Sequence, residues 1–229
     1  MPIGVLTNAV AALAGGALGS LLSRHMPRTL LEQLPALFGY CAIAIGVNAI
    51  IKAANMTAVV LAVLVGFCAG HGLKLERRTQ ALCGQAVKAA RLGGISDMNL
   101  YITLVALLCF SGFGWYGALT ESISGSPDIL FSKSALDFFT AMLFGSALGW
   151  AVCLIPIGQA AVMLLVFLAG KLAAPFFTAE AFMNLSACGG ILTLATGLRI
   201  ANIKSIPIID AIPALALAWP LSALLRLLG

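Results

Sequence analysis

Charge is scarce in this sequence of 229 residues. Asp, Glu, Lys and Arg make up only 9% of the chain, and 61% of it is hydrophobic, whereas a soluble domain carries about 25% charged residues. The mean hydropathy of +1.06 agrees with this composition. An ordinary soluble fold is therefore excluded. Because a helix needs roughly 20 apolar residues to cross a bilayer core of about 30 Å, the chain has room for about eight crossings and little else.

The strand pattern of a membrane barrel is also missing. Such strands alternate apolar and polar residues over about 10 positions, whereas this chain has long unbroken runs of Leu, Ala and Val. The sequence predicts an all-α integral membrane protein, a single transmembrane domain over residues 1–229. It would hold about eight transmembrane helices, or as few as six if some runs form bent or re-entrant elements.

The signatures of catalytic and metal sites are absent from the sequence as well. The six cysteines form no CxxC pair, and the two histidines have no carboxylate at ligand spacing. No nucleophile elbow or phosphate-binding loop occurs. We therefore expect no disulfide framework, no metal site, no cofactor and no catalytic residue. An enzyme is the least supported class of function.

Eight apolar runs are long enough to be candidate spans. The first begins at Ile3 without a basic segment or a clear cleavage site, so we interpret it as a retained helix rather than a signal peptide. Seven of the predicted spans are residues 3–23, 35–53, 57–73, 134–155, 159–174, 185–198 and 206–225, and the fourth in chain order starts near Met98 and reaches the glycine cluster that begins at Gly112. The fourth contains a cluster of glycines and is predicted to be broken there.

Positive charge is concentrated between the third and fourth spans. Residues 74–97 form the longest polar stretch and are predicted to contain an amphipathic helix at the membrane interface. Together with Arg24, Arg28, Arg199 and Lys204, these basic residues fall on one side of an eight-span chain, although Lys52 and Lys171 fall on the other. The positive-inside rule predicts that the basic side is cytoplasmic and that both termini are outside. The net charge of +5 thus reflects topology, and we expect no nucleic-acid partner.

An internal repeat is suggested by two short alignments. Residues 11–19 match 141–149 at several Ala, Leu and Gly positions, and Gly72-Leu73-Lys74-Leu75 resembles Gly197-Leu198-Arg199-Ile200. Both alignments pair spans four apart, as in two parallel-repeat halves. Chance matches are frequent in so restricted an alphabet. The chain would divide into a first half (1–118), a central polar loop (119–133) and a second half (134–229).

The central stretch contains the sequence GFGWYG, with glycines at Gly112, Gly114 and Gly117. It matches the letters of a dinucleotide fingerprint but lacks the strand–turn–helix context that such a site requires. Two interpretations stay open. The glycines either allow close helix packing or break the fourth span, so that freed backbone groups can line a polar cavity.

Four charged residues follow the glycines within a chain that mostly avoids charge. They are Glu121, Asp128, Lys133 and Asp137. Ser134 with Asp137 fits a helix-start pattern, so capping is a sufficient reason for some of these residues. Capping does not account for Glu121 and Lys133, because an ionisable group inside the membrane costs about 2.5–3.5 kcal/mol and needs a partner or water.

Two further polar residues lie within other apolar runs. Asp210 sits one turn into the last span between two prolines, and Asn48 lies near the end of the second. Asp210 either pairs with a nearby base at the interface, which we favour, or binds a cation or proton. Both residues are candidate contributors to a central site.

With these residues in view, the chain resembles the YqgA/YdfK-like family of bacterial membrane proteins, a domain of unknown function. The resemblance covers nearly the whole chain and is most specific in the central stretch and in residues 187–224. In the centre, the residues that match the family's pattern are Gly114, Gly117, Ala118, Glu121, Gly125, Asp128, Ile129, Leu130, Lys133, Ser134 and Asp137. Ser126-Pro127 displaces the glycine that related chains carry before the acid. The resemblance implies a multi-pass protein of the bacterial inner membrane with a transport role.

Two functions remain open on these grounds. The leading hypothesis is a transporter or channel for a small ion or polar solute, with a cation or zwitterion preferred because acids outnumber bases in the centre. Its site would combine the broken span at Gly112, Gly114 and Gly117 with the side chains of Glu121, Asp128, Lys133, Ser134, Asp137, Asp210 and Asn48. The alternative is a membrane scaffold that forms homo-oligomers through GxxxG faces such as Gly15-xxx-Gly19. In both cases the lipid bilayer is a partner.

Overall fold

Helices make up all of the regular structure that the computed structural model describes, which covers residues 1–23, 28–89, 95, 98–176 and 178–228. No strand occurs in those ranges. The helices are α1 (Ile3–Leu22), α2 (Arg28–Ile50), α3 (Met56–Gly72), α4 (Leu75–Ala89), α5 (Met98–Cys109), α6 (Gly112–Ser124), α7 (Asp128–Leu148), α8 (Ile155–Ala173), α9 (Ala179–Ile200) and α10 (Pro213–Leu228). Three 3₁₀ segments, η1 (Gly149–Leu154), η2 (Ala174–Phe176) and η3 (Ile208–Ala211), join them.

The predicted all-α membrane fold is confirmed. Each predicted span coincides with a helix, and the fourth coincides with the pair α5 and α6. By length and apolar composition, the described residues contain five helical stretches able to cross a membrane, or up to six if the bent pair α3–α4 is one span. Within α2, the described residues contain the shorter apolar helix Ala36–Ile50.

The basic segment forms the amphipathic helix that the sequence predicts over part of its length. The stretch Leu75–Gln85 of α4 is bent by 54° from α3, and the turn between them places Lys74 at a positive φ of 54°. Residues 90–94 and 96–97 of this segment, with Arg91 among them, lie outside the described residues, as does Arg24 after α1. The predicted charge pattern on these residues is therefore not addressed by the structure.

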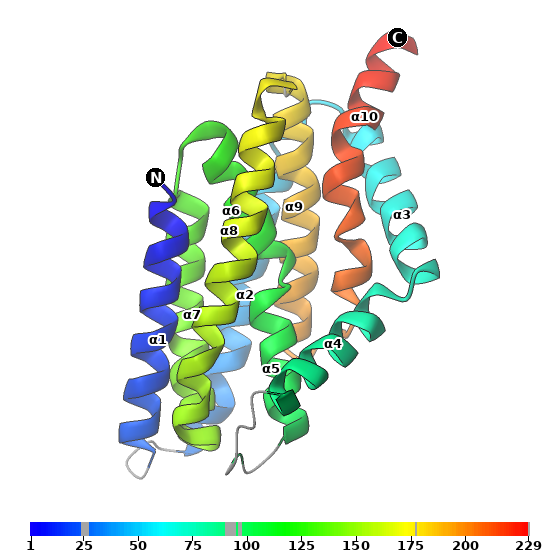
Figure 1. Cartoon of the computed structure of the whole chain (residues 1–229). Helices are drawn as coiled ribbons and strands as arrows, with labels where there is room; N and C mark the ends of the chain where they lie inside the picture. The colour runs from blue at the N-terminus through cyan, green and yellow to red at the C-terminus, as the bar shows by residue number, and fades with distance from the viewer. Residues whose placement is uncertain (24–27, 90–94, 96–97, 177, 229) are drawn as a thin grey trace.

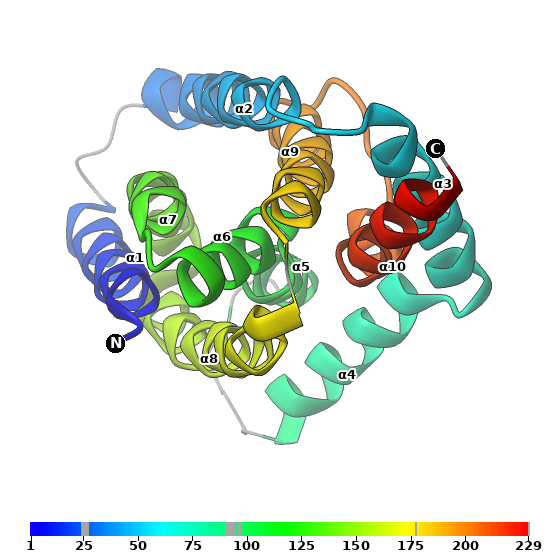
Figure 2. The same cartoon turned by 90° about the horizontal axis from the view of Figure 1, so that it is seen from above.

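Both termini lie at one end of the molecule and α4 lies toward the other (Figure 1). The turn between α6 and α7 is at the same end as the termini, here called the upper end. This relation agrees with the predicted sidedness of the loops. Viewed from above, α6 lies in the middle, surrounded by the other helices (Figure 2).

The buried fraction of each helix agrees with its place in the bundle, from the central helices outward. The α5–α6 and α9 stretches bury 62% and 67% of their apolar windows, compared with 33% for α1. Large apolar side chains on α1, α3 and α8, such as Leu6, Leu64 and Leu165, are exposed in the isolated chain. Because lipid is as apolar as these side chains, they form the surface that the bilayer would cover.

Small residues let α1 and α7 approach closely. A Cβ atom added to Gly15 would collide with the backbone of Phe138, and one added to Gly19 would collide with that of Met142. Both glycines belong to residues 11–19, one of the two segments that the sequence analysis aligned as a repeat. The contact accounts for their glycines by packing, and the repeat itself stays a prediction.

A second glycine-mediated contact joins α2 to α9. A Cβ at Gly46 would lie 2.6 Å from the carbonyl oxygen of Gly190, and a Cβ at Gly197 would lie 2.6 Å from that of Gly39. Close helix approach of this kind is how small residues stabilise membrane bundles. The small-residue faces of this chain are thus covered by its own helices.

Two local expectations from the sequence are wrong. The segment 119–133, expected to be a loop, is helical except for residues 125–127. In addition, α7 begins at Asp128 with Pro127 at its N-cap position, so Ser134 is not a cap and donates instead to the carbonyl of Leu130 at 2.6 Å. The reason is that Gly125, with a φ of 76°, ends α6 sharply and allows α7 to start at once.

Candidate functional site

A buried ion pair occupies the middle of α7. The ammonium group of Lys133 donates to Oδ2 of Asp137, one helical turn later, and the two side chains are 2% and 7% exposed. Asp137 lies nine residues after the start of α7 at Asp128, which is about 13 Å along the helix axis. The pair therefore lies inside the length of α7 rather than at either of its ends.

Two amide side chains from other helices complete the surroundings of Asp137. The Nδ2 atom of Asn8 on α1 donates to Oδ2 of Asp137 at 2.9 Å, and Nε2 of Gln159 on α8 donates to the same oxygen at 2.6 Å. Asn8 is 1% exposed and Gln159 is 0% exposed. Three helices thus place donors around one carboxylate oxygen, which stabilises its negative charge.

The side-chain carbonyl oxygens of these two amides take no part in the contacts with Asp137. Asn8 Oδ1 and Gln159 Oε1 are buried and have no hydrogen-bond partner among the described residues. A buried polar atom without a partner costs about 1–3 kcal/mol. We call Asn8, Lys133, Asp137 and Gln159 the core cluster.

Glu121 is buried next to this cluster on α6. Its Oε1 accepts the backbone N–H of Gly4 at 2.7 Å, and Oε2 has no partner in the described part of the chain. A Cβ at Gly4 would lie 2.9 Å from that free oxygen and 2.8 Å from Leu130 Cβ, so this glycine lets α1 approach both side chains closely. Glu121 and Lys133, which the sequence singled out together, therefore bind different partners.

The predicted break in the fourth span is present, and it lies beside Lys133. The helix α5 ends at Cys109 and α6 begins at Gly112, with Ser111 capping it by accepting the Gly114 N–H at 3.0 Å. Lys133 packs on this start, because a Cβ at Gly114 would lie 2.8 Å from its Cε atom. Gly117 packs on Leu130 of α7, where a Cβ would lie 2.6 Å from Cδ2. Gly112 and Gly114 thus lie at the break, whereas Gly117 serves helix packing.

A polar pocket of about 510 Å³ opens near the upper end, between α2, α6, α7 and α9. Asn48 of α2 and Lys52, two residues after its end, line this pocket together with Asp128 and Ser132 of α7. The sequence analysis had singled out Asn48 and Asp128, and the structure brings them together here, both exposed. They line this pocket and are not part of the core cluster.

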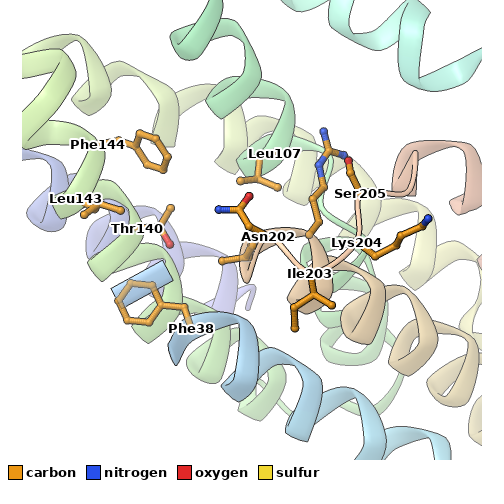
Figure 3. A pocket seen from close by; sticks show the side chains of 11 residues that line it. Phe38, Leu107, Thr140, Leu143, Phe144, Asn202, Ile203, Lys204 and Ser205 are labelled. Carbon is orange, nitrogen blue, oxygen red and sulfur yellow. The ribbon is translucent and has the colours of Figure 1, made fainter. Parts of the chain in front are cut away.

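A second pocket, of about 390 Å³, lies toward the lower end between α2, α5, α7 and the segment after α9. Phe38, Thr140 and Phe144 project from the helices, and Asn202 and Lys204 project from the segment after α9 (Figure 3). Arg199 also lines it. This pocket carries two basic side chains, whereas the upper pocket carries one base and one acid.

The core cluster lies between these two pockets along α7. Lys133 is one turn after Ile129, which lines the upper pocket, and Asp137 is almost one turn before Thr140, which lines the lower pocket. Residues three or four apart are neighbours on a helix surface. The buried Lys133–Asp137 pair therefore lies on α7 between the residues that line the two pockets.

Asp210 belongs to a different group of charges at the lower end. Its Oδ2 atom lies 3.0 Å from Nδ1 of His71, and its Oδ1 accepts the backbone N–H of Glu76 at 2.7 Å. Glu76 in turn accepts from Arg199 at 2.9 Å and from the backbone of Ile209 at 3.1 Å. These contacts fasten α4 to α3, α9 and η3. Asp210 thus pairs with His71 rather than with Lys204 or Arg199, the bases that the sequence suggested, and its interfacial position stays a prediction.

Sequence reasoning missed Asn8 and Gln159 as members of the site. Their signal was present, because each is a polar residue within an apolar run. Each was only one polar residue among several. Their convergence on Asp137 depends on helix neighbours that are 129 and 22 residues apart in sequence, which no local pattern reports.

Comparison with known proteins identifies the family. Residues 3–223 match the family model described as a protein of unknown function, DUF554. The chain belongs to this family. It is 40% identical over 228 residues to the uncharacterised protein YqgA of Escherichia coli (strain K12), covering 97% of each chain. It is 23% identical over 221 residues to the uncharacterised membrane protein YdfK of Bacillus subtilis (strain 168), covering 93% of this chain and 92% of that one. No solved structure matches it significantly.

Membership agrees with the fold. One relative is described as a membrane protein, and the helices of this DUF554 protein are long and apolar enough to cross a bilayer several times. It is a membrane protein of a family without an established function.

Proposed function

We propose that this DUF554 protein carries a small ion or polar solute across the bacterial inner membrane, with the core cluster as its central site. The observation that carries the proposal is the Lys133–Asp137 pair, buried in the middle of α7 with one pocket toward each end. A buried ion pair in a membrane protein is expensive and marks substrate or ion pathways more often than it stabilises the fold.

The route we propose runs between α2, α7 and α9. Both pockets use these three helices, the upper one together with α6 and the lower one together with α5. In alternating-access transporters, a central site is exposed first to one side and then to the other. Here the site would be reached from the upper pocket past Ser132 and from the lower pocket past Thr140.

The break between α5 and α6 supports this reading. Non-helical backbone at membrane depth is tolerated only where it is buried in protein or lines a cavity. Ser111 at the break lies against Gly114, and Lys133 packs on the same glycine. The backbone groups freed by the break are therefore close to the charged site, where they can help to hold a polar solute.

The scaffold alternative draws less support from the geometry. A scaffold needs small-residue faces that are open to a partner, but Gly15 and Gly19 pack against α7 within the chain. It also gives no reason for a buried ammonium at the centre of the bundle. Self-association through another surface stays a prediction.

The test is solute flux through purified protein reconstituted into liposomes, recorded as currents on a solid-supported membrane or as tracer uptake. A panel of ions and amino acids would be applied to the wild type and to Asp137→Asn and Lys133→Ala. Each has a matched control elsewhere, Asp128→Asn at the start of α7 and Lys171→Ala near the end of α8, both exposed. We expect flux in the wild type and its loss in the two core variants.

The controls decide what a loss of flux means. Lys171→Ala should retain flux, and Asp128→Asn should alter the apparent affinity at most, because Asp128 lines only the upper pocket. Folding of each variant is checked by gel filtration in detergent. A folded wild type that carries no solute of the panel contradicts transport and favours the scaffold.

A further inference from the structure

The buried charges of the site do not balance. Glu121 and Asp137 are 4% and 5% exposed, and Lys133, at 2%, is the only basic side chain buried with them among the described residues. Two formal negative charges thus face one positive charge. An uncompensated charge in the membrane core is costly, so this group is one positive charge short.

Oxygen atoms without hydrogen-bond partners among the described residues belong to the residues that surround these unbalanced charges. Glu121 Oε1 accepts a hydrogen bond from Gly4, and Asp137 Oδ2 accepts one from Asn8. Gly4 and Asn8 are four residues apart on one face of α1. Four residues of helix correspond to about 6 Å along the axis. Glu121 Oε2 and Asn8 Oδ1, both without partners in the described residues, therefore belong to neighbouring turns of the same buried surface.

We infer that this group of residues is a binding site for one small monovalent cation, such as Na⁺ or Li⁺. Its ligands would be the carboxylates of Glu121 and Asp137 and the amide oxygens of Asn8 and Gln159. This inference rests on the proposed function in one respect, since it names the cation that transport would use. The binding site itself can be tested without any flux.

The chemistry of the ligands selects the kind of cation. Carboxylate and amide oxygens bind hard cations, whereas softer metals prefer Cys and His ligands. A single positive charge brings the sum for Glu121, Asp137 and Lys133 to zero. A divalent ion would leave an excess positive charge in the membrane core, where charge is costly, so Mg²⁺ and Ca²⁺ should bind poorly.

The ammonium group of Lys133 would compete with the bound cation for the carboxylate of Asp137. Both would be attracted to Asp137, so a cation that contacts this carboxylate displaces the ammonium in part. The displaced ammonium would lie near the break between α5 and α6, because Lys133 Cε lies beside Gly114 at the capped start of α6. The last carbonyls of α5 carry the partial negative charge of a helix C-terminus. Cation binding would thus shift Lys133 from Asp137 toward the break.

The experiment measures thermal unfolding of the full chain in detergent, in buffer whose only cation is choline. LiCl, NaCl, KCl, MgCl₂ and choline chloride are then titrated at matched ionic strength. Binding of Na⁺ or Li⁺ should raise the Tm saturably, by on the order of 5–10 °C at a hundredfold excess over Kd. Choline and Mg²⁺ should leave the Tm unchanged.

Two isosteric variants locate the effect. Glu121→Gln removes the charge deficit, so its Tm should no longer respond to Na⁺. Glu180→Gln, at the first turn of α9 and only partly buried, should respond like the wild type. If Glu121→Gln does not fold, binding of radioactive ²²Na⁺ to the wild type, with unlabelled Li⁺ and choline as competitors, provides the same decision.

The outcomes separate this inference from the proposed function. Equal Tm values in Na⁺ and choline, together with no ²²Na⁺ binding, overturn the cation site. An equal loss of response in Glu180→Gln also overturns it. Solute flux that is independent of Na⁺ would leave transport standing without this site, whereas Na⁺ binding without any flux would support the site and contradict transport.

Discussion

Lys133 and Asp137 are four residues apart on α7 and are joined by a direct contact between ammonium and carboxylate. On a solvent-exposed helix, such a pair would contribute about 0.3–0.5 kcal/mol. Here both side chains are almost fully buried, so their removal from water costs more than a surface pair could return. Removing only one partner leaves the other charge buried and uncompensated, which is the more expensive state.

This relationship predicts a strong coupling between substitutions at the two positions. Lys133→Met and Asp137→Leu should each lower the free energy of unfolding by about 3–5 kcal/mol, because each leaves a buried charge without its partner. The double variant should be more stable than either single variant. It should not reach the wild type, because Asn8 and Gln159 lose their acceptor. Denaturant titration in detergent measures all four proteins, and strictly additive losses would contradict the pairing.

The contact between α1 and α7 predicts a sharp difference between two glycines. Gly19→Ala places a methyl group into the backbone of Met142, and overpacking of this kind costs about 1–3 kcal/mol. Gly72→Ala, at the end of α3, meets no atom within 4 Å and should be neutral or slightly stabilising. Unfolding of the two variants in detergent measures the difference. Equal stability of both would mean that α1 and α7 do not approach as closely as the structure places them.

The sequence predicted the break in the fourth span but not where the next helix, α7, begins. Three glycines in an apolar run indicated a break near Gly112, and α5 ends and α6 begins there. The same reasoning took Ser134 and Asp137 as a helix start, because the four-residue capping pattern was present. A second helix-start pattern, Ser126-Pro127-Asp128, was also present, and it is the one that the structure uses. Gly125 ends α6, so α7 starts at Asp128 and Asp137 lies nine residues further along the helix.

The partners of Asp137 lay beyond sequence reasoning for a physical reason. The spacing of Lys133 and Asp137 on one helix was visible in the sequence, whereas Asn8 and Gln159 reach the carboxylate from α1 and α8. Those contacts depend on the crossing of helices, which is set by glycine packing across several turns of each helix. Composition and periodicity predict that helices form, but not which of their faces meet.

The charges at the lower end predict how α4 is held. Glu76 accepts hydrogen bonds from Arg199 and from the backbone of Ile209, and its own backbone N–H donates to Asp210. Glu76→Ala should therefore release α4 from the bundle and increase hydrogen exchange of the amides in 75–89, by about tenfold for each 1.4 kcal/mol lost. Arg77→Ala, an exposed neighbour on the same helix, should leave exchange unchanged. Similar exchange in the two variants would show that these contacts do not hold the helix.

The two pockets and the predicted orientation can be tested together by cysteine labelling. In a background with all six native cysteines replaced, three single cysteines are introduced. They are Ser132→Cys in the upper pocket, Asn202→Cys in the lower pocket and Ser134→Cys, which is buried in α7. The reagent is a charged thiosulfonate that does not cross the membrane. It is added to intact cells or to inside-out vesicles, and labelling is followed by mass spectrometry.

Each position should react according to its exposure. The positive-inside rule places the upper end outside, so Ser132→Cys should be labelled in intact cells and Asn202→Cys in inside-out vesicles. Ser134→Cys should react slowly from both sides, because its side chain is covered although it lies only two residues from Ser132. A reversed pattern would contradict the orientation and leave the pockets intact. Labelling of Ser132→Cys and Asn202→Cys from the same side would instead contradict two pockets that open to opposite faces, and with them the proposed route through α2, α7 and α9.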